Sequence, residues 1–151
     1  MTRMAPTVHG SVVLVGPRAI LMRGPAGAGK SHLVLQTLAA AETGLFRFAR
    51  LVADDRVMLA AAHGRLIARP APELAGLLEV RGLGIRRVAY EPMAVVTLVC
   101  DLADQHAQRM PDGSDSTTVI EGITLPRLSV PAGVDQLLIV AAALETERGA
   151  P

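Results

Sequence analysis

The chain has 151 residues, half of them hydrophobic and only 2% aromatic, so we expect one domain with an aliphatic core. The formal net charge of +1 argues neither for nor against an acidic partner, and no basic run suggests nucleic-acid binding. A single cysteine, Cys100, excludes an internal disulfide, and no apolar stretch reaches the roughly 18 residues of a membrane span. We expect a cytoplasmic protein without membrane segment or signal peptide, a single domain over residues 1–151, ordered from about residue 8 to residue 146.

The first predicted elements are a strand hairpin and a helix. Residues 11–15 and 19–22 are short apolar runs on either side of a glycine–proline–arginine turn at residues 16–18. Residues 30–42 then carry apolar side chains at helical spacing, and Gly44 supplies a stop signal beyond the end of that helix. The order is therefore strand, turn, strand, loop and helix.

Between the second strand and the helix lies the pattern G-x-x-x-x-G-K-[ST], which is typical of a phosphate-binding loop. Its residues are Gly24, Pro25, Ala26, Gly27, Ala28, Gly29, Lys30 and Ser31. The glycines let backbone N–H groups turn inward around an anion, and the following helix adds its positive end. We expect Lys30 to reach the β- and γ-phosphates of ATP and the Ser31 hydroxyl to bind Mg²⁺. The alternative is a chance glycine turn, against which the flanking strand and helix argue.

Two carboxylates, Asp54 and Asp55, end the next apolar run at residues 50–53. The carboxyl ends of neighbouring parallel strands meet at a ligand crevice, so we predict that this strand ends beside the strand that feeds the phosphate loop. Both carboxylates then suit a Mg²⁺–nucleotide site. A solvated turn between two strands is the alternative.

A hairpin is predicted next, from residues 56–62 and 65–68, turning at His63 and Gly64. His63 is expected to be an exposed turn residue without a chemical role. An irregular link rich in proline, residues 69–72, should follow because proline discourages regular structure.

Residues 77–85 place charged side chains and two glycines inside an apolar stretch. Glu79 is either a further carboxylate of the metal or nucleotide site or the partner of Arg81 in a structural ion pair. Gly82 and Gly84 suggest that the backbone here closely approaches something else, without indicating what. The remaining predicted elements are a buried strand over 93–100 closed by Asp101, a polar loop over 102–116, a hairpin over 117–125, a crossing over 128–131, and a helix from 135 to about 145.

Three segments together resemble the HPr kinase/phosphorylase family: the phosphate loop, the strand end at residues 51–55, and residues 77–85. The last reads L-L-E-V-R-G-L-G-I, close to the family signature L-L-E-I-R-G-L-G-I. His9 also precedes Lys30 at the family's spacing; without that match we would interpret it as a strand-edge histidine bonded to a backbone carbonyl. The resemblance covers about residues 8–144 and implies an α/β, P-loop-containing kinase domain with a mostly β core sheet flanked by helices.

The resemblance implies an ATP- and Mg²⁺-dependent kinase that phosphorylates a serine of the phosphocarrier HPr in the sugar phosphotransferase system. It implies that Asp55 accepts the serine proton, that His9 orients Asp55 or the phosphate, and that Lys30 neutralises the phosphates. The metal site would be formed by Ser31, Glu79 and Asp54. Arg109 is the candidate for the family's later catalytic arginine. The family is usually a homo-oligomer, a hexamer.

Three departures from the family pattern bear on function. Few residues precede His9, so we expect a short form without the family's N-terminal domain and its regulation. The segment around Arg109 lacks the usual D-R-L-G run. The family's P-G-R-N loop, tied to dephosphorylation, is replaced by P-A-G-V-D at residues 131–135, so we expect weak or absent phosphorylase activity. A nucleotide-sensing regulator without transfer and a small-molecule kinase on the same scaffold are the alternatives.

Overall fold

The computed structural model describes residues 6–107, 113 and 116–145 of the chain. Within these residues the strands are β1 (Val8–His9), β2 (Ser11–Val15), β3 (Arg18–Arg23), β4 (Ala49–Ala53), β5 (Arg56–Ala62), β6 (Arg65–Pro70), β7 (Leu77–Val80), β8 (Gly84–Arg87), β9 (Ala94–Leu102), β10 (Thr117–Ile120) and β11 (Ile123–Val130). The helical segments are α1 (Lys30–Glu42), the 3₁₀ turn η1 (Pro72–Leu74) and α2 (Gln136–Glu145). Neither α-helix in this part of the chain is long and apolar enough to cross a bilayer.

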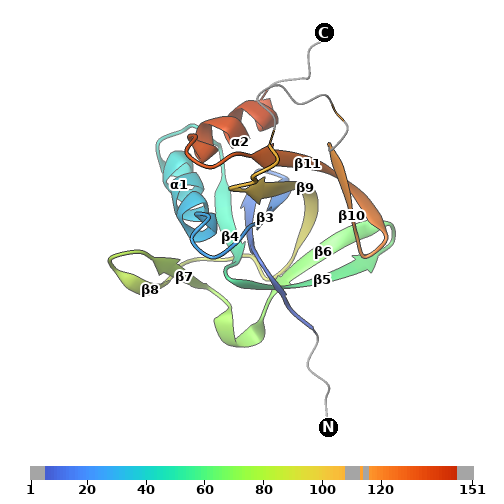
Figure 1. The fold of residues 1–151 in the computed structure, drawn as a ribbon. Helices are drawn as coiled ribbons and strands as arrows, with labels where there is room; N and C mark the ends of the chain where they lie inside the picture. The colour runs from blue at the N-terminus through green and yellow to red at the C-terminus, as the bar shows by residue number, and fades with distance from the viewer. Residues whose placement is uncertain (1–5, 108–112, 114–115, 146–151) are drawn as a thin grey trace.

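A mixed sheet organises the described residues (Figure 1). Its strand order is β1-β5-β6-β9-β3-β2-β4, with β11 beside β9 and β10 beside β11. Strand β3 is parallel to β9, and β9 is parallel to β11, so the carboxyl ends of these three strands lie at one edge of the sheet. The phosphate loop leaves this edge directly after Arg23, the last residue of β3.

The structure corrects the route by which Asp54 reaches the loop. We predicted that the strand before Asp54 lies directly beside the strand that feeds the loop, but β2 lies between β4 and β3. Because β2 is antiparallel to both, β3 and β4 still run in the same direction. Val12 of β2 pairs with Leu21 on one side and with Ala53 on the other, which brings the ends of β3 and β4 to the same edge.

Apolar side chains alternate between the two faces of the sheet, as expected for strands buried on both sides. Val13 and Met22 belong to a core cluster that includes side chains of α1 and α2. Val12 and Leu21 belong to a second cluster that includes side chains of β5 and β6. Cys100 lies fully buried in the first cluster, where burial raises the pKa of its thiol to about 12.

Helix α1 spans the predicted range, Lys30–Glu42. It begins after Gly29, which has φ +99°, and neither a capping side chain nor an acidic residue occupies its first turn. The first N–H groups therefore remain available to an anion. At the other end Gly44 takes φ +88°, and the Leu45 N–H donates to the Ala40 carbonyl at 2.9 Å, so the predicted glycine stop is confirmed.

Most of the other predicted elements are present, with changes at their ends. The hairpin of β5 and β6 turns at His63 and Gly64 as predicted, and His63 is exposed. The irregular link at residues 69–72 is not observed: β6 continues through Pro70, because proline's fixed φ is compatible with extended backbone, and Pro72 starts a 3₁₀ turn.

The C-terminal part also differs from the prediction at two places. Residues 128–131 were expected to cross over the fold, but β11 continues to Val130 and pairs with β9. Its backbone N–H and C=O groups are thereby satisfied in the sheet. Helix α2 begins at Gln136, one residue later than expected. Asp135 caps it, because its Oδ1 accepts the Leu138 N–H at 3.2 Å.

Candidate active site

The phosphate loop depends on its glycines. Gly29 and Gly27 take φ values of +99° and +83°, a region that favours residues without a side chain. A Cβ on Gly24 would lie 2.8 Å from the Leu102 carbonyl oxygen, so the start of the loop packs directly against the end of β9. The loop is thus a tight turn set between β3, β9 and α1.

Lys30 folds back over this loop. Its Nζ donates to the Gly24 carbonyl at 2.7 Å and to the Pro25 carbonyl at 3.0 Å. Burial lowers the pKa of Lys30, and the negative charges of Asp55 and Asp54 act in the opposite direction. The ammonium group therefore lies within electrostatic reach of both carboxylates.

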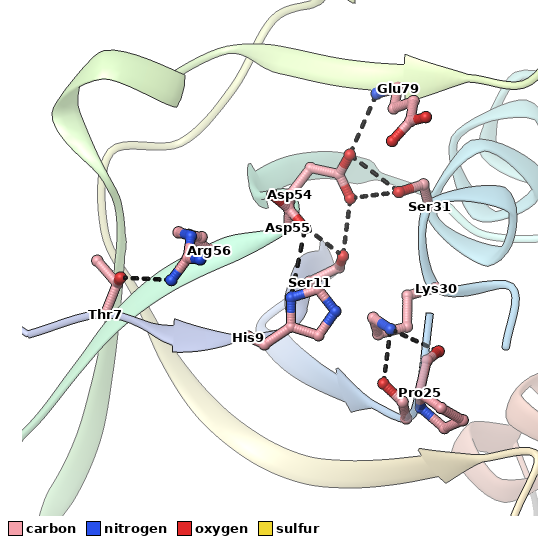
Figure 2. A network of polar contacts seen from close by, with 11 residues as sticks. Thr7, His9, Ser11, Pro25, Lys30, Ser31, Asp54, Asp55, Arg56 and Glu79 are labelled. Carbon is pink, nitrogen blue, oxygen red and sulfur yellow. Dashed lines mark hydrogen bonds and ion pairs between the residues drawn. The ribbon is translucent and has the colours of Figure 1, made fainter. Parts of the chain in front are cut away.

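Asp54 joins three separate segments of the chain (Figure 2). Its side chain is buried and accepts hydrogen bonds from the Ser11 hydroxyl at 2.7 Å and from the Ser31 hydroxyl at 2.7 and 2.9 Å. The backbone N–H of Glu79 donates to the other side of the carboxylate at 3.1 Å. Asp54 therefore fixes the position of the hydroxyl predicted to bind Mg²⁺ relative to β2 and β7.

Asp55 sits in a strained turn directly after Asp54. It has φ +69°, and the Arg56 N–H donates to the Asp54 carbonyl at 2.8 Å, which closes a γ-turn around Asp55. Such turns are rare for residues with a side chain and cluster at functional sites. The turn carries the Asp55 side chain out of the core, leaving it 57% exposed and 3.3 Å from Nδ1 of His9 (Figure 2).

His9 therefore contacts Asp55 rather than a backbone carbonyl. Nδ1 of His9 faces Oδ1 of Asp55 directly, and an imidazole N–H at this position can donate to a carboxylate. This contact occupies Oδ1 of Asp55 and leaves Oδ2 for another donor. The arrangement suits a carboxylate that is held in one orientation and receives a proton from a third group.

Glu79 lies at the rim of this cluster. Its side chain is exposed, and Figure 2 shows its carboxylate on the side of β7 that faces Ser31. The alternative ion pair with Arg81 is not found among the residues described. Among the described residues, nothing lies within 4 Å of a Cβ on Gly82 or Gly84, so their φ values of +84° and +94° serve the turn between β7 and β8, and a close approach to another molecule stays a prediction.

The sequence analysis did not predict a network of charged side chains at the end of β3, where the phosphate loop begins. Arg23, the last residue before the loop, donates to both oxygens of Asp101 at 2.7 and 2.9 Å. Arg127 donates to the same carboxylate and, at 2.7 Å, to Asp104. Burial alone would raise the pKa of Asp101, but Arg23 and Arg127 outweigh it and the pKa is lowered. The pKa of Asp104 is lowered to about 2, mainly because the Ser129 hydroxyl donates a hydrogen bond to its carboxylate.

Gln136 was also missed by the sequence analysis. Its Nε2 donates to the Ala28 carbonyl at 2.9 Å, and its Oε1 lies 3.0 Å from the position of a Cβ on Gly29. The first residue of α2 therefore packs against the phosphate loop at Ala28 and Gly29. The available signal was a polar residue at the head of an otherwise apolar helix. For Ser11 the signal was similar, a hydroxyl at the start of an apolar strand.

The structure thus brings together most of the predicted site residues. His9 lies against Asp55, and Asp54 lies against Ser31 and the backbone of Glu79. Lys30 lies in the phosphate loop next to both carboxylates. Arg109 lies outside the described residues, so its assignment stays a prediction.

A family model described as the HPr Serine kinase C-terminal domain matches residues 2–148 of the chain. The chain belongs to this family. The resemblance stated from the three motifs is therefore confirmed. The solved structure of the Hpr(Ser) kinase/phosphatase from Coxiella burnetii is 25% identical and superposes with a TM-score of 0.72, covering 92% of this chain and 88% of that chain. The predicted α/β kinase-domain fold is confirmed with it.

Curated relatives named HPr kinase/phosphorylase match most of the chain. The protein from Limosilactobacillus reuteri (strain DSM 20016) is 31% identical over 154 residues, covering 93% of this chain and 46% of the relative. The protein from Halalkalibacterium halodurans is 32% identical over 143 residues, covering 86% of this chain and 44% of the relative. The chain therefore spans about half the length of the curated relatives it matches.

Proposed function

We propose that this chain is a protein-serine kinase that transfers the γ-phosphoryl group of ATP to a serine of an HPr-like phosphocarrier. The observation that carries the proposal is the pair Asp54 and Asp55. Asp54 is buried and bonded to the phosphate-loop serine, whereas Asp55 projects into solvent against His9. A nucleotide sensor needs the first carboxylate but has no use for a second one aimed at an incoming hydroxyl.

The neighbouring residues divide the chemistry between them. The phosphate loop and the start of α1 bind the phosphates through backbone N–H groups, and Lys30 adds a positive charge beside them. The acceptor serine hydroxyl is a poor nucleophile, and Asp55 aligns it and accepts its proton as the new P–O bond forms. His9 keeps the Asp55 carboxylate in one orientation. The transition state of phosphoryl transfer mainly requires such positioning and cations around the equatorial oxygens.

Mg²⁺ fits the residues present. The part of the chain that the structure describes has no group of three His, Cys, Asp or Glu side chains that could hold a metal. Mg²⁺ typically binds one or two carboxylates together with substrate phosphates and water, so a complete protein cage is not required. The residues that would hold it are the Ser31 hydroxyl and Asp54, which contact each other, together with Glu79, whose backbone contacts Asp54. When bound, the ion neutralises charge on the phosphates.

The proposal includes the setting of the enzyme. The family suggests a homo-oligomer, a hexamer in its usual form, that acts in the cytoplasm on a carrier of the phosphotransferase system. We further propose that the phosphorylase activity of this enzyme is weak or absent. A small-molecule kinase on the same scaffold is the second candidate, since the phosphate loop alone does not select the acceptor.

A phosphotransfer assay tests the proposal. The protein is incubated with radiolabelled ATP, Mg²⁺ and either purified HPr-like carriers or a panel of hydroxyl-bearing metabolites. Label on a carrier, with mass spectrometry locating it on a serine, supports the kinase assignment. Label on a metabolite alone would support the second candidate, and nucleotide binding without transfer to anything would support the sensor.

A further inference from the structure

The hairpin of β7 and β8 stands outside the main sheet and projects away from it (Figure 1). In its register Glu79 lies opposite Ile85, and Leu78 lies opposite Arg86. Directly opposite residues of an antiparallel pair share a face. One face therefore carries Leu78, which is fully buried against the core. The other face carries Glu79 and Ile85.

The face with Ile85 is both apolar and basic. Ile85 and Leu83 each expose 62% of their surface. Arg87 follows Ile85 on the same face, and Arg81 lies in the turn; both are exposed. Within the described residues, no ion pair or hydrogen bond involves either arginine side chain. Exposed aliphatic groups beside unpaired guanidinium groups are typical of a surface that binds another protein.

This face is continuous with the candidate active site. Glu79, which lies opposite Ile85, donates its backbone N–H to Asp54. Opposite Cβ atoms in an antiparallel pair are about 5 Å apart. Ile85 is therefore a direct neighbour of Glu79, the predicted metal ligand. The hairpin is thus joined to the candidate site through Asp54, the residue directly before Asp55.

We propose that the face of the β7–β8 hairpin that carries Ile85 and Arg87 is the docking surface for the protein acceptor. It fits an acceptor whose serine lies next to an apolar patch flanked by carboxylates. This inference rests on the proposed kinase function. A small, transient contact suits a hairpin of this size, because a stable interface uses about 20–30 residues on each side.

A second copy of the chain fits this face less well. The two arginines require an acidic surface opposite them. Several acidic side chains of this chain are already engaged, since Asp101 and Asp104 are bound by arginines and Glu91 by Arg50. The charge of the hairpin therefore favours a separate acidic partner over self-association.

The test compares charge reversal on the two faces of the same strand. Arg87→Glu changes the proposed docking face, and Arg86→Glu makes the same change on the opposite face. With HPr as the acceptor, we expect Arg87→Glu to raise the KM for HPr about tenfold. The KM for ATP and kcat should stay within about twofold of wild type, and Arg86→Glu should leave all three parameters within about twofold.

A second variant tests the apolar part of the face without endangering the fold. Ile85 is mostly exposed, so Ile85→Ser should leave the unfolding midpoint unchanged. It should weaken HPr binding, measured by calorimetry without ATP, by about threefold or more. Because this measurement does not depend on transfer, it remains informative if the kinase function is wrong.

The outcomes separate the two proposals. If HPr binds wild type and both docking-face variants, Arg87→Glu and Ile85→Ser, with equal affinity, the docking surface is wrong whatever the activity. If the variants change the oligomeric state while the KM and affinity for HPr stay the same, the face belongs to a second copy. If wild type binds HPr without phosphorylating it and Arg87→Glu weakens that binding, the docking surface stands and the kinase function falls. An absence of HPr binding to wild type overturns the docking surface.

Discussion

The Ser31 hydroxyl donates to the Asp54 carboxylate at 2.7 Å, across 23 positions of the chain. This contact ties the first turn of α1 to the end of β4. Because the same carboxylate also binds Ser11 and the Glu79 backbone, one side chain links α1, β2 and β7 at the candidate site. In the proposed function, the buried Asp54 supports nucleotide binding, and the exposed Asp55 next to it takes part in phosphoryl transfer.

The first prediction concerns Asp54. Asp54→Asn removes the negative charge and leaves one of the donors without its acceptor. We expect Mg²⁺-dependent ATP affinity to fall about tenfold or more, and the free energy of unfolding to fall by about 1–3 kcal/mol. Nucleotide titration and urea denaturation measure the two effects. Ser11→Ala is the control, since it removes one hydrogen bond but keeps the Ser31 contact. Equal ATP affinity in Asp54→Asn and wild type would contradict the assignment.

The second prediction concerns the strained turn at Asp55. A residue with a Cβ pays about 1–2 kcal/mol in the left-handed region, and glycine does not. We expect Asp55→Gly to be as stable as wild type or more stable by up to about 1 kcal/mol, although it loses transfer. Asp55→Ala keeps the strain and should be less stable than Asp55→Gly. Urea unfolding of the two variants decides this, and an alanine variant at least as stable as the glycine variant would argue against strain at this position.

The third prediction concerns acid sensitivity. Folding lowers the pKa of Asp101 and lowers that of Asp104 from 3.8 to about 2. Carboxylates with a lowered pKa in the folded state contribute stability above their unfolded pKa and lose it as the pH falls through the folded pKa. Wild-type stability should therefore fall between about pH 4 and pH 2.

The matched variant for this prediction is Asp104→Asn. It should be less stable than wild type at pH 7 but should lose less stability on acidification, because one of the titrating groups is gone. Urea midpoints measured across the pH range test this. Parallel curves for wild type and Asp104→Asn would show that Asp104 does not contribute to the acid transition.

The fourth prediction concerns the reverse reaction. Residues 131–135 lie next to Gln136, which contacts the phosphate loop, so this segment is close to the site. We expect slow pyrophosphate release from phosphorylated HPr in the presence of inorganic phosphate, since the family's arginine is absent and Asp135 adds negative charge. Val134→Arg combined with Asp135→Asn restores G-R-N and keeps a good helix cap. This variant should release pyrophosphate about tenfold faster. Rapid release by wild type would refute the prediction.

Much of the site could be predicted because its residues form local patterns. The phosphate loop is contiguous in sequence, and its glycines and Lys30 identify it without tertiary information. Asp54 and Asp55 follow an apolar run, and His9 was assigned through the family's spacing. To place these residues together, it was enough to predict that the strands before the phosphate loop and before Asp54 end at the same edge of the sheet. This holds for β3 and β4 even though β2 lies between them.

The residues that support the site could not be predicted, because they come from distant segments. Arg23, Asp101 and Arg127 meet only through the parallel pairing of β3, β9 and β11. Gln136 is a polar residue at the head of an apolar helix, but this signal alone does not indicate that α2 reaches the phosphate loop, 108 positions away. The two faces of the β7–β8 hairpin likewise depend on a register that two glycines near its turn make difficult to foresee.

The most direct measurement is phosphate transfer by Asp55→Asn in a single turnover, with ATP affinity determined on the same preparation. The account predicts unchanged ATP affinity, within about twofold, and a rate of transfer to the HPr serine lower by about 100-fold or more. Transfer at the wild-type rate would show that Asp55 does not accept the serine proton, and the division of roles between Asp54 and Asp55 would be wrong.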